Sequence, residues 1–94
     1  MSPKVSIGLP VFNGQKYLKK TINSILVQTY KNFELIISDN LSNDETKEIC
    51  KSYKKKDNRI KYIRQKKHIS SLANYEFTLN SARGDYFMWI AADD

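Results

Sequence analysis

Short apolar runs alternate with longer segments of helical periodicity along the whole chain. Four runs, at residues 5–11, 33–38, 60–63 and 86–90, are rich in β-branched and aromatic residues, a composition typical of β-strands. The run at 33–38 is almost entirely apolar at its centre, as expected for a parallel strand that is covered on both faces. The first run is punctuated by Pro10 and closed by the turn pair Asn13-Gly14.

The first two segments between these runs show the spacing of amphipathic helices. Residues 15–28 carry apolar side chains at positions i, i+4, i+7 and i+8, which are Leu18, Ile22, Ile25 and Leu26. Ser42 and Glu45 have the spacing of a capping box, which predicts a second helix over about residues 43–56. The inward positions of this helix are expected to be Thr46, Ile49, Cys50 and Tyr53.

A third helix is expected to start near Ser70 or Ser71 and to end at Ala82, with Gly84 providing a left-handed exit. Its apolar positions are Leu72, Ala73, Phe77 and Leu79. The order β-α-β-α-β-α-β predicts an α/β fold, a three-layer arrangement around an open, mostly parallel sheet with right-handed crossovers. Phe87 and Trp89 in the last run are expected to belong to the sheet core. No repeat or linker is visible, so residues 1–94 are expected to form a single domain.

Composition limits the classes of protein that fit. Hydrophobic residues make up 40% of the 94 residues and Gly and Pro together number five, which excludes collagen-like and disordered chains. The single Cys50 cannot form an intrachain disulfide, and no apolar run is long enough to span a bilayer. These features predict a cytoplasmic protein. The last strand runs into Asp93 and Asp94 with no covering element after it, so we expect a chain truncated at its C-terminus.

Polar residues collect where three of the predicted strands end. Phe12 and Asn13 follow the first strand, Asp39 and Asn40 the second, and Asp93 the fourth. In open α/β sheets ligands bind outside the carboxyl ends of the strands, where the strand order reverses. The sequence therefore predicts a ligand cleft at this edge of the sheet.

Four segments, taken in order, resemble the N-terminal half of a family 2 glycosyltransferase with the GT-A fold. They are VSIGLPVFN at 5–13, FELIISDNLSND at 33–44, LAN at 72–74 with ARGDY at 82–86, and WIAADD at 89–94. The resemblance implies transfer of a sugar from a nucleotide diphosphate donor to a hydroxyl group, as in cell-surface polysaccharide or glycolipid synthesis. It also implies a divalent metal, Mg²⁺ or Mn²⁺, bound between the protein and the diphosphate.

The resemblance assigns roles by position. Asp39 would contact the nucleobase, Pro10, Phe12 and Asn13 would seat the nucleotide, and Asp93 would hold the metal and with it the nucleotide, with Asp94 as a second metal position. Two positions depart from the family pattern: Ala91 replaces the first Asp of the D-x-D motif and Asn40 replaces a frequent second Asp. No catalytic residue is assigned, because the family's catalytic base lies beyond the D-x-D segment. The 94-residue chain is therefore expected to bind the donor without turning it over.

Positive charge is concentrated in one stretch. The chain has a formal charge of +6, and residues 51–67 contain nine Lys or Arg residues against Asp57 alone. Such a stretch is often a solvated face, but it can attract a nucleotide diphosphate, an anionic membrane face or nucleic acid. Arg64 lies nearest the predicted cleft and is the candidate for a donor-phosphate contact. His68 is expected to be a surface loop residue.

Four further interpretations concern function and partners. A basic nucleic-acid-binding α/β domain without enzymatic activity is the alternative function, although only Tyr53 and Tyr62 lie among the basic residues and no nucleic-acid motif is present. A phosphoacceptor domain is disfavoured because its acidic residues would stand in a different order. Peripheral contact with the inner membrane face is compatible with the charge, and pairing of the last strand between copies would give a homo-oligomer.

Overall fold

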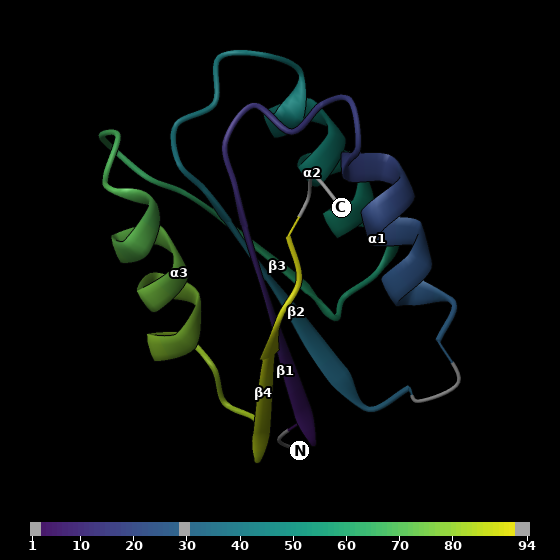
Figure 1. The fold of residues 1–94 in the computed structure, drawn as a ribbon. Coiled ribbons are helices and arrows are strands. Elements are labelled where there is room, and N and C mark those ends of the chain that lie inside the picture. The colour runs from purple at the N-terminus through teal and green to yellow at the C-terminus, as the bar shows by residue number, and fades with distance from the viewer. Residues whose placement is uncertain (1–2, 29–30, 92–94) are drawn as a thin grey trace.

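A computed structural model describes residues 3–28 and 31–91 (Figure 1). Seven elements follow one another in the predicted order. They are β1 (Val5–Val11), α1 (Leu18–Leu26), β2 (Phe33–Asp39), α2 (Thr46–Lys56), β3 (Ile60–Arg64), α3 (Ser71–Asn80) and β4 (Tyr86–Trp89).

The four strands form one parallel sheet in the order β3-β2-β1-β4. β1 lies at its centre, with Val5 opposite Phe33 and Val11 opposite Asp39. Helices α1 and α2 cover one face and α3 covers the other, which gives the predicted three layers (Figure 1). The chain adds strands in one direction from β1 to β3 and then places β4 on the other side of β1, so the strand order reverses between β1 and β4.

The face under α1 and α2 is the apolar core. Its fully buried side chains include Leu9, Leu18, Ile22, Leu35, Ile37 and Cys50. The predicted stripe of α1 and the inward positions of α2 are confirmed, with Leu26, Ile49 and Tyr53 at the margin of the core. Burial, together with the carboxylates of Asp39 and Asp44, raises the pKa of the Cys50 thiol to about 12.

The face under α3 is polar and closely packed. Asn74 and Thr78 are its buried helix residues, whereas Leu72 and Leu79 are 71% and 43% exposed. The predicted apolar face of α3 is therefore wrong at these two leucines. A Cβ atom on Gly8 would lie 2.5 Å from Thr78 Oγ1, so α3 approaches β1 closely only because residue 8 is a glycine.

A buried carboxylate fastens the end of α3 to the sheet. Glu34 Oε2 accepts hydrogen bonds from Ser6 Oγ at 2.6 Å and from the Arg83 N–H at 2.7 Å. The Gly84 N–H donates to Ser6 Oγ at 2.7 Å. Gly84 does not have a positive φ, so the predicted left-handed exit is wrong. The glycine is needed because a Cβ atom there would lie 2.8 Å from Ser6 Oγ.

Three further expectations are corrected. α1 begins at Leu18 instead of residue 15, and α2 begins at Thr46 with Glu45 as an N-cap that makes no side-chain capping bond. The capping box is therefore absent. Trp89 is 45% exposed instead of being in the core, although its Nε1–H donates to Thr78 Oγ1 at 3.0 Å. Within the described ranges, no helix has both the length and the apolar character that crossing a membrane requires.

Candidate functional site

A cleft of ≈ 490 Å³ lies at the carboxyl ends of the central strands. Its walls are the end of β1 and the turn that follows it (residues 10–14), Lys16 and Tyr17 ahead of α1, Asn40, His68, residues of α3, and Ala91 after β4. This is the point where the strand order reverses, as the sequence predicts for a ligand site in an open α/β sheet.

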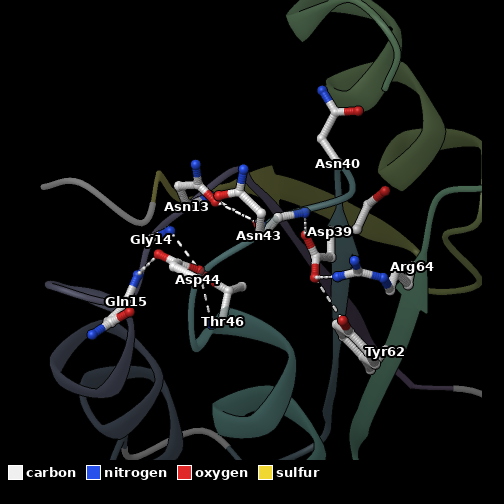
Figure 2. A network of polar contacts seen from close by, with 12 residues as sticks. Asn13, Gly14, Gln15, Asp39, Asn40, Asn43, Asp44, Thr46, Tyr62 and Arg64 are labelled. Carbon is white, nitrogen blue, oxygen red and sulfur yellow. Dashed lines mark hydrogen bonds and ion pairs between the residues drawn. The ribbon is translucent and has the colours of Figure 1, made fainter. Parts of the chain in front are cut away.

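The loops after β1 and β2 are joined by reciprocal hydrogen bonds (Figure 2). The Asn13 N–H donates to Ser42 Oγ at 2.8 Å, and the Asn43 N–H donates to Asn13 Oδ1 at 2.9 Å. Asn13 has φ 50, a conformation that Asn tolerates better than most residues. This pairing explains the missing capping box, because the Ser42 hydroxyl serves the neighbouring loop instead of its own helix.

Three more bonds extend this junction to the starts of the two helices (Figure 2). The Gly14 N–H donates to Thr46 Oγ1, the Gln15 N–H to Asp44 Oδ2, and the Glu45 N–H to Gln15 Oε1, at 3.0, 3.2 and 3.0 Å. Burial alone would raise the pKa of Asp44, but hydrogen bonds from Thr46 and Gln15 lower it below its ordinary value. Asn13 and Gly14, which line the cleft, therefore belong to a hydrogen-bonded junction between the two loops.

Asp39 is fully buried beneath this junction (Figure 2). Its Oδ1 accepts from the Ser42 N–H at 2.9 Å, and its Oδ2 accepts from the Tyr62 hydroxyl at 2.6 Å and from Arg64 Nη1 at 3.3 Å. Burial and the neighbouring Asp39 carboxylate raise the pKa of Tyr62, so its hydroxyl remains a donor.

The structure therefore divides the predicted site residues into three groups. Pro10, Phe12 and Asn13 line the cleft, and the Phe12 side chain is 50% exposed. Asp39 and Arg64 form an ion pair and are not among the residues that line it. Asp93 and Asp94 lie outside the described residues.

The described residues alone do not fit a metal site. Over residues 3–28 and 31–91, no three His, Cys, Asp or Glu side chains gather closely enough to hold a metal ion, and no carboxylate lines the cleft. Both oxygens of Asp39 already accept hydrogen bonds from protein groups. A metal in this cleft would therefore depend on Asp93 and Asp94, which follow Ala91 in the sequence.

The predicted site did not include several residues of the cleft, and Asn40 and His68 are two of them. Asn40 and His68 both line the cleft, and the His68 ring meets the Phe12 ring edge to face with 4.7 Å between centroids. His68 is an exposed loop residue, as predicted, but the loop after β3 brings it to the cleft. The strand-end rule placed Asn40 at this edge of the sheet, and it could also have found His68, which lies in the loop after the carboxyl end of β3.

Comparison with known proteins gives a consistent result. The family model described as glycosyl transferase family 2 matches residues 6–94. Glycosyltransferase GlyA of Streptococcus pneumoniae is 38% identical over 91 residues, which cover 97% of this chain and 13% of that protein.

Two solved structures share the fold. S. aureus TarS, residues 1–349, in complex with UDP has a TM-score of 0.87 and 25% identity, covering 96% of this chain and 27% of that one. The mannosyltransferase PcManGT of Pyrobaculum calidifontis, in complex with GDP-Man and Mn²⁺, has a TM-score of 0.87 and 18% identity, covering 99% and 28%. The chain spans less than a third of each of these three proteins. The four-stranded parallel sheet with its helices is the GT-A fold, and the chain belongs to glycosyl transferase family 2.

Proposed function

We propose that this chain is the donor-binding part of a glycosyltransferase that moves a sugar from a nucleotide diphosphate to a hydroxyl acceptor. The acceptor class would be a cell-surface polysaccharide or glycolipid. The observation that carries the proposal is the cleft at the strand-order reversal of a chain whose residues 6–94 match the family. Residues 1–94 would act in this proposal as one nucleotide-sugar-binding domain.

The cleft offers suitable groups for a nucleotide. The half-exposed Phe12 ring gives a base an apolar surface, and Lys16 at the cleft wall is a cation for phosphate oxygens. Asp39 Oδ1 accepts one protein hydrogen bond and is the proposed acceptor for a nucleobase N–H. Because Asp39 is fully buried and does not line the cleft, this contact requires a local rearrangement when the nucleotide binds. Arg64 is the proposed phosphate contact, because four of its five N–H donors are not used by Asp39.

The proposed cofactor is Mg²⁺ or Mn²⁺, held by Asp93 with Asp94 as a second ligand. The Mn²⁺ bound in the Pyrobaculum mannosyltransferase supports this proposal at the level of the shared fold. When bound, such an ion stabilises the charge that develops on the diphosphate leaving group. The chain's own task is to bind the nucleoside and hold the donor against the end of the sheet.

A nucleotide titration followed by amide chemical shifts tests this function. Addition of UDP should shift the Phe12, Asn13 and Asn40 amides together, and should shift those of Asp93 and Asp94 only when diamagnetic Mg²⁺ is also present. The purified chain should show no sugar transfer. Shifts confined to residues 51–67, with none at the cleft for UDP or GDP, would contradict the proposal.

The exposed face of α2 is proposed as a contact with the inner face of the cytoplasmic membrane. Lys47, Lys51, Lys54 and Lys55 recur at helical spacing, and none of them has an ion pair with a described residue. Like charges at i and i+4 destabilise a helix, and lysine clusters attract anionic lipid headgroups. A relative from Campylobacter jejuni, 38% identical over 93 residues, is a GalNAc(5)-diNAcBac-PP-undecaprenol beta-1,3-glucosyltransferase. Polyprenol lipids reside in membranes, so this relative supports a membrane contact.

Vesicle sedimentation tests the membrane contact. The chain should sediment with phosphatidylglycerol vesicles, remain in solution with phosphatidylcholine vesicles, and dissociate as salt is raised. Replacing the four lysines by Gln should remove at least most of this binding, whereas replacing Lys16, Lys19 and Lys20 by Gln should not. Equal binding by the α2 variant, or preferential binding to RNA over the anionic vesicles, would refute it.

A further inference from the structure

Asn40 closes a two-sided hydrogen-bonded clamp on the loop after β3. Its Nδ2 donates to the Ile69 carbonyl at 2.7 Å, and its Oδ1 accepts from the Ile69 N–H at 2.8 Å. Asn40 is 3% exposed, so these bonds are protected from water. An Asp at this position would lose the donor to the Ile69 carbonyl and place a carboxylate against it. The amide therefore fixes the loop beside the end of β2.

The backbone carbonyl of Asn40 determines which ring nitrogen of His68 carries the hydrogen. His68 Nδ1 lies 3.1 Å from the Asn40 backbone carbonyl oxygen. A carbonyl oxygen only accepts, so Nδ1 must carry the hydrogen. In the neutral ring Nε2 is then a hydrogen-bond acceptor, and no described residue donates to it. The Phe12 ring, edge to face at 4.7 Å, supports the orientation of the imidazole from the side.

We propose that His68 is a specificity-determining contact for the donor nucleotide, with Nε2 accepting a hydrogen bond from a hydroxyl or N–H group of the nucleoside. The inference rests on the proposed function, since it takes the cleft as the nucleotide site. Asn40 is the positioning residue, because it fixes both the loop and the tautomer. His68 lines the cleft together with Phe12, so an aromatic surface and a directed acceptor stand side by side there.

The tautomer gives the first test, because His68 is the only histidine of the chain. Nitrogen-15 spectra of the ring, recorded at about pH 8.5 where a histidine ring is neutral, should show hydrogen on Nδ1. Addition of UDP with diamagnetic Mg²⁺ should then shift the Nε2 resonance in the direction of an accepted hydrogen bond. Hydrogen on Nε2 would overturn the inference. So would an unchanged Nε2 while the Phe12 and Asn13 amides respond to UDP, and that pattern would leave the proposed function intact.

Variants give the second test. His68→Phe keeps a ring against Phe12 but removes the acceptor, and should weaken UDP binding about 2- to 10-fold, the range for one hydrogen bond. Asn40→Asp should weaken binding similarly, and the double variant should lose little more, because both changes remove the same contact. Glu76→Gln, on the exposed side of α3, is the matched control and should bind as the parent does. Unaltered binding by folded His68→Phe, or additive losses in the double variant, would refute the inference.

Analogues identify the donor group on the nucleoside. UDP, 2′-deoxy-UDP, 3′-deoxy-UDP and N3-methyl-UDP differ in single hydroxyl or N–H groups. The analogue that binds more weakly than UDP to the parent chain but equally to His68→Phe marks the group that Nε2 accepts from. If every analogue loses the same factor against both chains, His68 makes no such contact. Absence of any shift or binding with every nucleotide would instead contradict the proposed function.

Discussion

At the scale of single residues, Glu34 is the clearest buried polar group with a defined task. Burial alone would raise its pKa, but hydrogen bonds from Ser6 and the Arg83 N–H and the ion pair with Lys61 lower it below the ordinary 4.5. A group whose folded pKa is depressed stabilises the fold above its unfolded pKa, and this contribution is lost as the pH falls through the folded value. The pKa values of the Asp44 and Asp57 carboxyls are also lowered, so their contributions to stability are likewise lost as the pH falls.

Replacement of Glu34 by Gln should therefore cost about 1.5 to 3 kcal/mol of unfolding free energy at pH 7, the range for hydrogen bonds to a charged group. The difference from the parent should shrink as the pH falls from the ordinary value of 4.5 through the lower pKa of the folded carboxyl, where the parent side chain also becomes protonated. Urea unfolding at a series of pH values measures both. Asp85→Asn is the control, because that carboxyl is exposed and its pair with Lys4 spans 3.7 Å, so a change within about 0.5 kcal/mol is expected. A pH-independent loss in Glu34→Gln would contradict the role given to its charge.

Some of the site residues could be predicted from the sequence, and others could not. Pro10, Phe12 and Asn13 could be predicted because the end of a parallel strand has a known place in the fold. The surroundings of Asp39 could not, because Tyr62 and Arg64 reach it only through the pairing of β2 with β3. The role of Ser42 was mistaken for the same reason. Its partner Asn13 is distant in sequence, and a local capping motif gives no sign of it.

At the scale of elements, the strands and all three helices follow from the sequence pattern, whereas the buried face of α3 does not. An amphipathic pattern predicts burial of Leu72 and Leu79, yet the buried residues are Asn74 and Thr78. Asn74 Oδ1 accepts from Ser38 Oγ at 2.6 Å and its Nδ2 donates to the Ser38 carbonyl at 3.1 Å. Helix and strand are thus joined by hydrogen bonds across a small-residue contact, which hydropathy does not register.

Hydropathy predicts that truncating Leu72 destabilises the fold more than truncating Asn74. We expect stability measurements on α3 to give the opposite order. Asn74→Ala should lower the unfolding free energy by about 1 to 3 kcal/mol, because it leaves the buried Ser38 carbonyl without this donor. Leu72→Ala should change it by less than about 0.5 kcal/mol, since the leucine is exposed. Thermal or urea unfolding of both variants decides the matter. A larger loss for Leu72→Ala would mean that α3 packs through its leucines.

At the scale of the whole molecule, β4 is one of the two edge strands of the sheet. It pairs only with β1 among the described residues, and Tyr86, Met88 and Trp89 are 63%, 46% and 45% exposed. An apolar edge strand is a template for further strand pairing. We therefore expect this chain, prepared alone, to form a homo-oligomer through β4.

Size-exclusion chromatography with light scattering over a range of concentrations tests this association. The mean mass should rise with concentration, and Met88→Lys should shift the transition to higher concentration by placing a charge on the edge strand. Val27→Lys is the matched control, because Val27 is 77% exposed, directly follows α1 and is not part of the sheet. A strictly monomeric parent chain, or an equal effect of Val27→Lys, would contradict pairing through β4.

The hydrogen-bonded junction beneath the cleft has a thermodynamic consequence. The loops after β1 and β2 are ordered by each other, through Asn13, Gln15, Ser42, Asp44 and Thr46, and the loop after β3 is ordered by Asn40. The conformational entropy of these loops is lost when the chain folds, so ligand binding does not have to order them. Affinity for a ligand and resistance to unfolding are then coupled in this fold, and a substitution that loosens the junction weakens both.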